Sequence, residues 1–167
     1  NPDARLALLA PTGKAAQRIN EAIKAAIAKL KITKPKREQL EKISASTIHR
    51  FLGYKYNSPF FKYNENNPLP NDLIVIDEAS MVDIALMSKL LKALPPKAAL
   101  ILIGDKNQLS SVEAGAFFGH ICTDNNLQNN VINLTKNWRF GADSGIGKLS
   151  NLINQGQKLS ELKPLFN

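Results

Sequence analysis

Cysteine is nearly absent from this sequence, because Cys122 is the only one among 167 residues. A single thiol excludes an intrachain disulfide and any zinc site built from several cysteines, and we interpret Cys122 as a small buried apolar residue rather than a nucleophile. The chain also lacks the run of about 18 apolar residues that a membrane helix needs. Nothing at its start resembles a signal peptide. These absences predict a soluble, cytoplasmic protein with no membrane partner.

Methionine is scarce as well, with only Met81 and Met87, and the chain begins at Asn1. We therefore expect this chain to be a piece of a longer protein. Its 167 residues, of which 44% are hydrophobic, are enough for one domain with an ordinary packed core, or for most of one.

Acidic residues are scarce in the first part of the chain only. Residues 1–63 contain 13 Lys or Arg against 4 Asp or Glu, a balance of +9, whereas residues 64–167 contain 9 against 10. Lys and Arg neutralise phosphates in nucleic-acid complexes, but a basic helix face exposed to solvent has the same composition. Charge alone leaves these two interpretations equally open.

The stretch "LLAPTGKAAQRI", residues 8–19, contains Thr-Gly-Lys but lacks two parts of a P-loop. A P-loop has a glycine five positions before its Gly-Lys, and a Ser or Thr after the lysine that binds Mg²⁺. Here Leu8 occupies the first of these positions and Ala15 the second. The stretch is therefore either a chance Gly-Lys at the start of a helix or a phosphate contact for a different ligand.

Short apolar runs alternate with helical patterns along the chain. Continuous apolar runs without alternation are typical of strands that are covered on both faces, and strands that alternate with helices predict a parallel α/β sheet. The predicted strands are residues 5–9, 73–76, 99–103 and 131–135. One predicted helix ends near residue 31, and a second begins near residue 36. Two more are predicted at residues 82–94 and 114–122.

Residues 54–72 form an aromatic segment between two of these helical and strand patterns. Together with Phe51, this neighbourhood contains six of the eleven aromatic residues. It predicts a β-hairpin with its turn at residues 57–59. The rings and the interleaved lysines Lys55 and Lys62 suit either packing on the domain or contact with unpaired bases.

Polar side chains follow two of the predicted strands. Asp77 and Glu78 come directly after residues 73–76, and Asp105 and Gln108 come after residues 99–103. In open α/β sheets, ligands bind beyond the carboxyl ends of the strands. An acid pair there is suited to hold Mg²⁺ and to activate a water molecule. The alternative is that these acids cap the helix that follows.

Five stretches in order resemble motifs Ia, Ib, II, III and IV of superfamily 1 DNA helicases, and within them the family of exodeoxyribonuclease V alpha chains. They are "APTGKAA", "STIHRFLG", "IVIDEAS", "GDKNQLSSVEAG" and "LTKNWRFGADSGIG". The resemblance spans residues 6–153. It implies a RecA-like P-loop NTPase sheet, parallel and flanked by helices, with an inserted β-hairpin. The family's P-loop, or Walker A strand-loop, lies upstream of the first stretch, so the fold is expected to be truncated.

The resemblance also implies roles for individual residues. Asp77 and Glu78 bind Mg²⁺ and activate water, Gln108 senses the γ-phosphate, and Arg139 is an arginine finger. Without the resemblance, Arg139 would be an ordinary surface arginine, and His49 has the alternative of a capping or core histidine. The positions that match the single-stranded DNA groove are Pro11, Thr12, Gly13, Lys14, Thr47 and His49.

The family resemblance implies an ATP- and Mg²⁺-dependent helicase that moves 5′ to 3′ on single-stranded DNA. It acts with beta and gamma subunits of exodeoxyribonuclease V in double-strand break repair and recombination. Residues 1–135 would belong to the first motor domain, with 54–72 as its hairpin, and residues 136–167 would begin the second. We expect the chain alone to be inactive. The alternatives are a relaxase-type or stand-alone helicase, and a DNA-binding module without ATPase activity.

Overall fold

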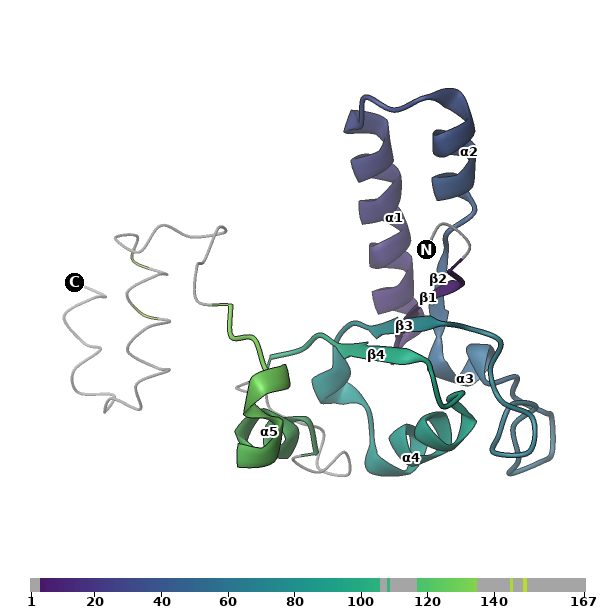
Figure 1. The fold of residues 1–167 in the computed structure, drawn as a ribbon, viewed down its shortest axis with the longest axis vertical. Helices are drawn as coiled ribbons and strands as arrows, with labels where there is room; N and C mark the ends of the chain where they lie inside the picture. Colours follow the sequence, from purple (N-terminus) through teal and green to yellow (C-terminus); the bar gives the residue numbers. More distant parts are fainter. Residues whose placement is uncertain (1–3, 106–107, 109–116, 135–144, 146–148, 150–167) are drawn as a thin grey trace. The chain divides into compact units, whose positions relative to one another are not determined.

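A computed structural model describes residues 4–105, 108, 117–134, 145 and 149 (Figure 1). The chain divides into two compact units, Asn1–Asp124 and Asn125–Asn167. Within the described ranges, no helix combines the length and apolar character needed to cross a membrane.

The first unit is built on a four-stranded sheet in the order β2-β1-β3-β4, in which every neighbouring pair is parallel. The strands β1 (Leu6–Ala10), β3 (Leu73–Ile76) and β4 (Ala99–Leu102) confirm three of the predicted strands, with ends shifted by at most one residue. The fourth, β2 (Ala45–Thr47), was not predicted. Because all four strands are parallel, their carboxyl ends lie along one edge of the sheet.

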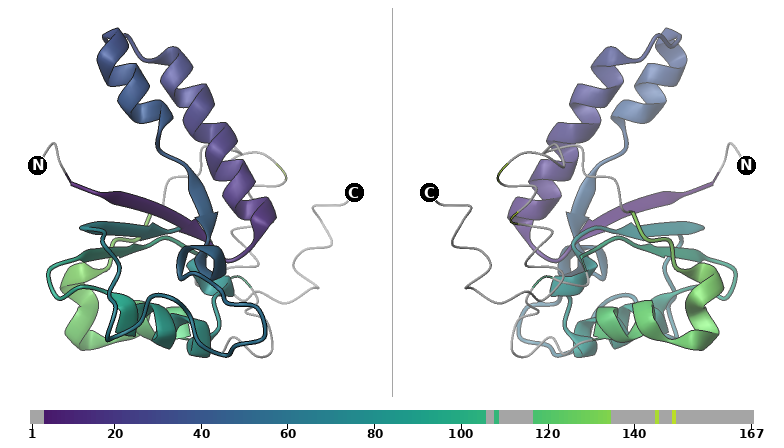
Figure 2. Two further views of the ribbon diagram at one scale, coloured as in Figure 1. Left: turned by 90° about the vertical axis from the view of Figure 1, so that its right-hand side faces the viewer. Right: turned by 90° about the vertical axis from the view of Figure 1, so that its left-hand side faces the viewer.

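Helices cover both faces of this sheet, with α1 on one face and α4 and α5 on the other (Figure 2). The helix predictions are confirmed with ends that differ by one or two residues where the structure describes them; residues 114–116 lie outside the described ranges. The helices of the first unit are α1 (Gly13–Lys29), α2 (Lys34–Glu41), α3 (Ile48–Phe51), the short 3₁₀ turn η1 (Ala79–Met81), α4 (Ile84–Ala93) and α5 (Phe117–Thr123).

The main core lies between the sheet and α4. Ile74 and Ile76 of β3 are fully buried against this helix, whose Leu90 is also fully buried. A smaller cluster of Ala10, Ala16 and Ala45 lies under α1. Alanines at these three positions let α1 approach β1 and β2 closely.

The other end of the sheet is held by Arg5 and Asp72, which precede β1 and β3. The backbone N–H of Arg5 donates to Oδ2 of Asp72 at 2.9 Å, and Nε of Arg5 donates to the same oxygen at 3.3 Å. These two hydrogen bonds hold the pKa of Asp72 below its ordinary value of 3.8. This contact therefore stabilises the fold above that pH and is lost as the pH falls through the lowered pKa.

The expectation that β4 is covered on both faces is wrong. Its side chains alternate in burial, and Ile101 is 47% exposed, as is Ile103, which follows the strand, at 48%. The reason is positional, because β4 lies at the edge of the described sheet while α1 packs over β1 and β2. Among the described residues, no strand pairs with the outer edge of β4, and one of its faces is largely exposed.

The strand expected at residues 131–135 is also absent where it is described. In the second unit, the 3₁₀ helix η2 (Asn125–Asn130) is followed by residues 131–134 without regular structure. Ile132 is 86% exposed and Leu134 90%. An apolar run becomes a strand only when a neighbouring strand pairs with its backbone, and these four residues have no such neighbour among the described residues.

The aromatic segment, residues 54–72, folds back on itself through an isolated antiparallel bridge between Tyr54 and Phe61, without the regular strands of the predicted β-hairpin. The backbone N–H of Lys62 donates to the carbonyl of Gly53 at 2.9 Å. Asn57, inside the expected turn, has φ of 55°, a left-handed conformation that Asn adopts more readily than most residues. Tyr56 and Phe60 are 86% and 73% exposed, so the tip of this segment presents aromatic rings to solvent.

Candidate functional site

The carboxyl edge of the sheet collects every predicted site residue that the structure describes. Along this edge the strand ends carry, from β2 to β4, Thr47 and then Pro11, Asp77 and Asp105. Neighbouring strands lie about 4.8 Å apart. The residues assigned to DNA therefore follow two adjacent strands, and the residues assigned to the nucleotide follow the next two. Arg139 lies outside the described residues.

The loop after β1 presents the start of α1 to solvent. Thr12 is the N-cap of this helix, and its Oγ1 accepts a hydrogen bond from the backbone N–H of Ala15 at 3.2 Å. Gly13 and Lys14 are exposed, and a Cβ built on Gly13 would meet nothing within 4 Å. The first turn of α1 contains no acid. An anion can therefore approach the exposed amides and Lys14, as at other helix N-termini.

The neighbouring loop, after β2, has a similar construction. Thr47 ends the strand and caps α3, with Oγ1 accepting from the backbone N–H of Arg50 at 3.2 Å. His49 is exposed and lies 5.9 Å from the ring of Phe61. Thr47 provides the cap and His49 is outside the core, so neither structural alternative for His49 is observed.

Asn20 on α1 fixes β2 against the sheet. Its Oδ1 accepts from the backbone N–H of Ala45 at 2.6 Å, and its Nδ2 donates to the Ala45 carbonyl at 3.2 Å. This pair of bonds satisfies the outer edge of β2 with a side chain instead of another strand. It also holds the loops of Lys14 and Thr47 in a fixed relation.

Asp77 and Glu78 form a tight turn at the end of β3. The backbone N–H of Asp77 donates to the Leu9 carbonyl at 2.9 Å, and that of Glu78 donates to Oδ1 of Asp77 at 3.0 Å. Glu78 has φ 54° and ψ 38°, a left-handed conformation that costs a non-glycine residue about 1 to 3 kcal/mol and often occurs at functional sites. Both side chains are half-buried.

The alternative role of this acid pair, as a cap for the following helix, is not observed. Asp83 is the N-cap of α4, and its Oδ1 accepts from the backbone N–H of Leu86 at 2.7 Å. Glu78 precedes the short turn η1 without a side-chain capping bond. The two carboxylates are therefore not used as helix caps.

The end of β4 is locked to this turn. The N–H of Ile103 donates to the Ile76 carbonyl, and the N–H of Ala79 donates to the Ile103 carbonyl, each at 2.8 Å. Beyond them, Gln108 donates through its backbone N–H to the Asp105 carbonyl at 3.2 Å, and both side chains are exposed. Two backbone hydrogen bonds therefore connect the end of β4 to the turn that carries the acid pair.

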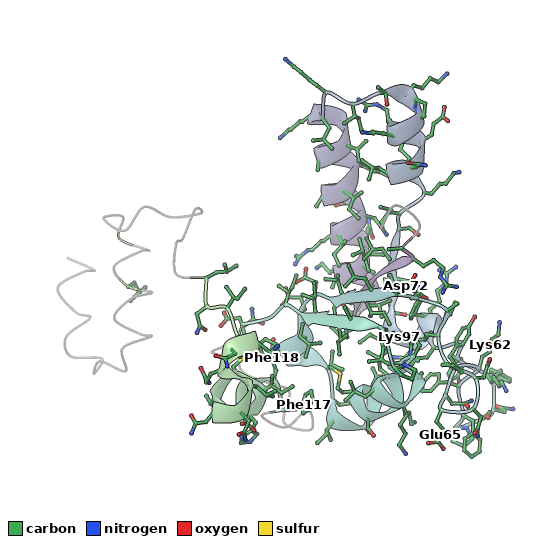
Figure 3. The ribbon with its side chains drawn as sticks, viewed as in Figure 1. Lys62, Glu65, Asp72, Lys97, Phe117 and Phe118 are labelled. Atoms are coloured by element: carbon green, nitrogen blue, oxygen red, sulfur yellow. The ribbon has the colours of Figure 1, made fainter. Side chains whose placement is uncertain are left out.

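Gly104 leaves little room for a side chain at this junction. A Cβ built on it would lie 3.1 Å from the backbone nitrogen of Ser80 and 3.1 Å from the ring of Phe118. Figure 3 shows Phe118 at the opposite end of the sheet from Asp72 and Lys97, which precede β3 and β4. The ring can rotate, but the backbone of Ser80 is held by the surrounding turn.

We expect Gly104→Ala to lower the free energy of unfolding by about 1 to 3 kcal/mol, because overpacking displaces the loop or the turn. The matched control is Gly119→Ala in α5, where a new Cβ meets nothing within 4 Å. That change is expected to be neutral or to stabilise by up to about 1 kcal/mol. Urea unfolding of both variants measures the difference, and equal stabilities would show that Gly104 is not sterically constrained.

A cofactor metal at this edge would have few protein ligands. In the part of the chain that the structure describes, no three His, Cys, Asp or Glu side chains cluster. Mg²⁺ commonly binds one or two carboxylates and takes its remaining ligands from water and substrate phosphate. The donor set of Asp77 and Glu78 fits Mg²⁺ bound together with a nucleotide, and does not fit an all-protein metal cage.

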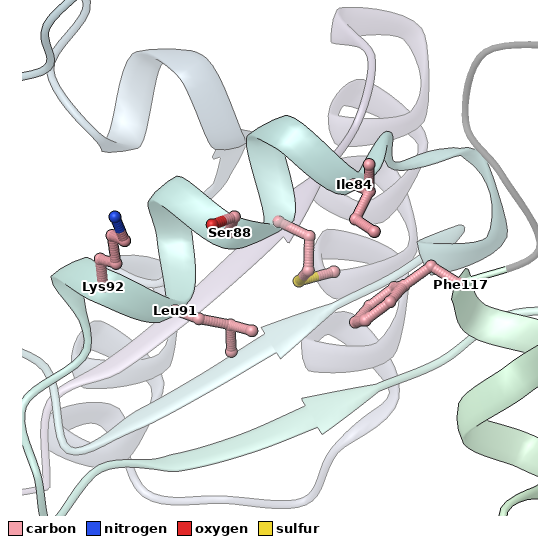
Figure 4. Close-up of a pocket in the computed structure, with 6 residues that line it drawn as sticks. Ile84, Ser88, Leu91, Lys92 and Phe117 are labelled. Carbon is pink, nitrogen blue, oxygen red and sulfur yellow. The ribbon is translucent and has the colours of Figure 1, made fainter.

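A separate apolar groove of about 350 Å³ lies between α4 and Phe117 (Figure 4). Its lining contains no predicted site residue and one cation, Lys92. Apart from Lys92, the described lining of the groove therefore has no charged group that could bind a phosphate, and it has no His, Cys, Asp or Glu ligand for a metal ion.

The four-stranded parallel sheet and its flanking helices form an α/β fold that is consistent with the P-loop NTPase class. Residues 1–114 match the family described as "AAA domain", and the chain belongs to this family. Membership implies nucleotide binding.

Comparison with individual proteins identifies a narrower group within this family. The chain is 37% identical over 181 residues to the RecBCD enzyme subunit RecD of Haemophilus influenzae, covering 90% of the chain and 28% of that protein. It is 43% identical over 157 residues to the same subunit of Mycobacterium tuberculosis, covering 93% of the chain and 26% of that protein. The chain is therefore a RecD-like AAA domain.

A shorter match joins the chain to a second type of relative. It is 42% identical over 108 residues to the ATP-dependent RecD2 DNA helicase of Deinococcus radiodurans, covering 65% of the chain and 12% of that protein. The chain thus spans little more than a quarter of the RecD relatives, and a smaller share of the RecD2 helicase.

Proposed function

We propose that this chain is part of an ATP-dependent 5′–3′ DNA helicase, the alpha subunit of exodeoxyribonuclease V. It would act in the cytoplasm with beta and gamma subunits in double-strand break repair and recombination. One observation carries the proposal: the sheet order β2-β1-β3-β4 puts the loops of Thr47 and Lys14 directly beside those of Asp77 and Gln108 on one edge. The RecD and RecD2 relatives support the choice of helicase.

The nucleotide half of the edge would carry hydrolysis. Asp77 would hold hydrated Mg²⁺ through a water ligand, and the ion would supply charge neutralisation at the phosphates. Glu78 would accept a proton from the attacking water, while the Gln108 amide would contact the γ-phosphate. Arg139 would stabilise the charge that develops on the transferred phosphoryl group, since a planar guanidinium suits that task.

The loops after β1 and β2, here called the DNA half, would bind the backbone of a single strand. The residues proposed to do so are Pro11, Thr12, Gly13, Lys14, Thr47 and His49. The hydrogen bond from Asp77 N–H to the Leu9 carbonyl joins the two halves, because Leu9 and Asp77 lie on adjacent strands. A movement of the acid pair on hydrolysis would therefore reach the loop of Lys14 through the backbone.

The phosphate-binding loop itself is proposed to precede residue 1. The open outer edge of β4, with exposed Ile101 and Ile103, offers backbone partners and apolar surface for one more strand. The sequence of about 30 preceding residues, the length of one strand-loop-helix unit, tests this. A Gly-x-x-x-x-Gly-Lys-Thr there supports the helicase, and its absence favours a DNA-binding module without ATPase activity.

The proposed domain organisation remains residues 1–135 in the first motor domain, with 54–72 as a hairpin insert, and residues 136–167 in the second. ATP would bind between the two motor domains, and this chain holds little of the second. We therefore propose that the chain alone does not hydrolyse ATP.

Lys14 provides a direct test of the DNA half. In the full-length protein, Lys14→Ala should weaken binding to single-stranded DNA and reduce the log-log salt slope by about 0.7, the loss of one phosphate contact. Lys97→Ala is the matched control, since Lys97 is exposed and precedes the opposite end of β4. Fluorescence anisotropy across a salt series measures both, and an unchanged slope for Lys14→Ala would remove it from the groove.

A further inference from the structure

Helices α1 and α2 and the loop between them, residues 13–42, form an arm that extends away from the sheet (Figure 1). The base of the arm is the loop of Lys14, and its tip is the connection between the two helices. Only the base contributes to the carboxyl edge described above, so most of the arm has no role in the proposed hydrolysis.

The arm carries a large positive charge, most of it on exposed side chains. It contains nine Lys or Arg residues and three Glu residues, and eight of the nine cations are exposed. The described residues contain one ion pair with an N–O distance within 4.0 Å, between Arg5 and Asp72, and both residues lie outside the arm. The arm's positive charge is therefore not neutralised by neighbouring carboxylates within the described chain.

The arm is also held together by specific hydrogen bonds. Arg37, the cation that is half-buried, donates from Nη1 to the Ile27 carbonyl at 3.0 Å and from Nη2 to the Leu30 carbonyl at 3.2 Å. These bonds satisfy the last carbonyls of α1 with a side chain from α2. These bonds hold α2 to the end of α1, and the two Asn20 bonds hold α1 to β2 of the sheet.

A stripe of cations runs from the base of the arm to its tip. At 100° per residue, Lys14, Arg18 and Lys29 fall within about 60° of one another on α1. The buried residues Ala16 and Ile27 lie on the opposite face. The stripe is about 22 Å long at 1.5 Å per residue. At the tip, residues 29–36 add Lys31, Lys34 and Lys36 with no acid among them.

The composition of the arm indicates which anion it fits. Sites for single-stranded nucleic acid combine basic grooves with aromatic rings that stack on bases, and residues 13–42 contain no aromatic residue. Duplex DNA needs no stacking partner and carries one charge per about 1.7 Å, or about 13 phosphates along 22 Å. Because Lys14 at the base belongs to the proposed DNA groove, the stripe continues from that groove.

We propose that the arm binds the phosphate backbone of duplex DNA adjacent to the single-strand groove, without reading base sequence. This rests on the proposed function for the position of the single strand, and adds a second contact with a different form of DNA. Glu21 is an acid close to the stripe, and its carboxylate accepts a hydrogen bond from the Gln17 amide at 2.9 Å. It should oppose duplex binding.

The test compares two double variants of the full-length protein that lose the same net charge. Lys31→Gln with Lys34→Gln neutralises the tip, and Lys92→Gln with Lys97→Gln neutralises two exposed lysines of the α4 region. Each is titrated with a forked DNA and with its single strand, over a salt series. The tip variant should bind the fork roughly tenfold more weakly, with a log-log slope reduced by up to about 1.8, and should bind the single strand normally.

A further variant, Glu21→Gln, should tighten binding to the fork, a gain that misfolding cannot produce. Equal losses on fork and single strand would overturn the proposal by placing the tip on the single-strand path. No loss on either DNA, or the same loss in the α4 control, would overturn it by showing a solvated face or a net-charge effect. Failure of the unmodified protein to bind single strands would instead count against the proposed function.

Discussion

Replacing Glu78 by Gln in the full-length protein is expected to slow ATP hydrolysis by about 10²- to 10⁴-fold, the range for loss of a general base. The amide has nearly the same size as the carboxylate, so the turn at the end of β3 is retained. It cannot accept a proton from water. Nucleotide binding should change little, because the proposed metal contact belongs to Asp77. Single-turnover hydrolysis and equilibrium binding of labelled ATP separate the two effects.

The matched control for this change is Glu65→Gln. Glu65 is exposed and lies in the aromatic segment, away from Phe118 in Figure 3. Its hydrolysis rate should equal that of the unmodified protein. A Glu78→Gln protein that hydrolyses ATP at close to the normal rate would exclude Glu78 as the base and reopen the assignment of this edge.

Truncation of the core should have the largest effect on stability. Ile74→Ala is expected to lower the free energy of unfolding by about 2 to 5 kcal/mol, because Ile74 is fully buried between the sheet and α4 and leaves a cavity when shortened. The control is Ile101→Ala on the neighbouring strand, where a side chain that is 47% exposed loses less burial.

Urea unfolding of the 167-residue chain, followed by far-ultraviolet circular dichroism, measures this pair of variants. Similar losses for Ile74→Ala and Ile101→Ala would mean that β4 is buried as deeply as β3. That result would contradict the observed edge position of β4 and, with it, the proposal that another strand pairs there.

The strands that the sequence predicted are those whose signal is local. Residues 73–76 are all large and apolar, and such a run is expected wherever a strand is covered on both faces. By contrast, β2 has the sequence Ala-Ser-Thr, which carries no apolar run. It becomes a strand through pairing with β1 and through the two hydrogen bonds of Asn20, which lies 25 residues away. Contacts at that separation have no local pattern.

The position of the site was predictable, and its local geometry was not. Since parallel strands end at one edge, polar residues after them were expected to gather there, and Asp77 and Asp105 do. The left-handed conformation of Glu78 follows from the bonds around the turn. The role of Asp83 as the cap of α4 follows from the insertion of η1 before that helix. Asp is a common N-cap residue, but the conformation of Glu78 has no signature in the residue types alone.

Residues 131–134 show that an apolar run alone does not make a strand. Their composition is that of a strand, yet Ile132 and Leu134 are almost fully exposed. Apolar composition reports which residues favour burial, while the strand itself needs a paired backbone. Ile101 on β4 is also exposed, and there a further strand is proposed to pair.

ATP hydrolysis by the full-length protein, measured with and without single-stranded DNA, tests the proposed coupling most directly. We expect DNA to raise the rate, because the loops of Lys14 and Thr47 share one sheet edge with Asp77 and Glu78, and Asp77 is hydrogen-bonded to β1, the strand that precedes the Lys14 loop. Hydrolysis that is indifferent to DNA, or no hydrolysis at all, would contradict the claim that this edge couples a nucleotide site to a DNA groove.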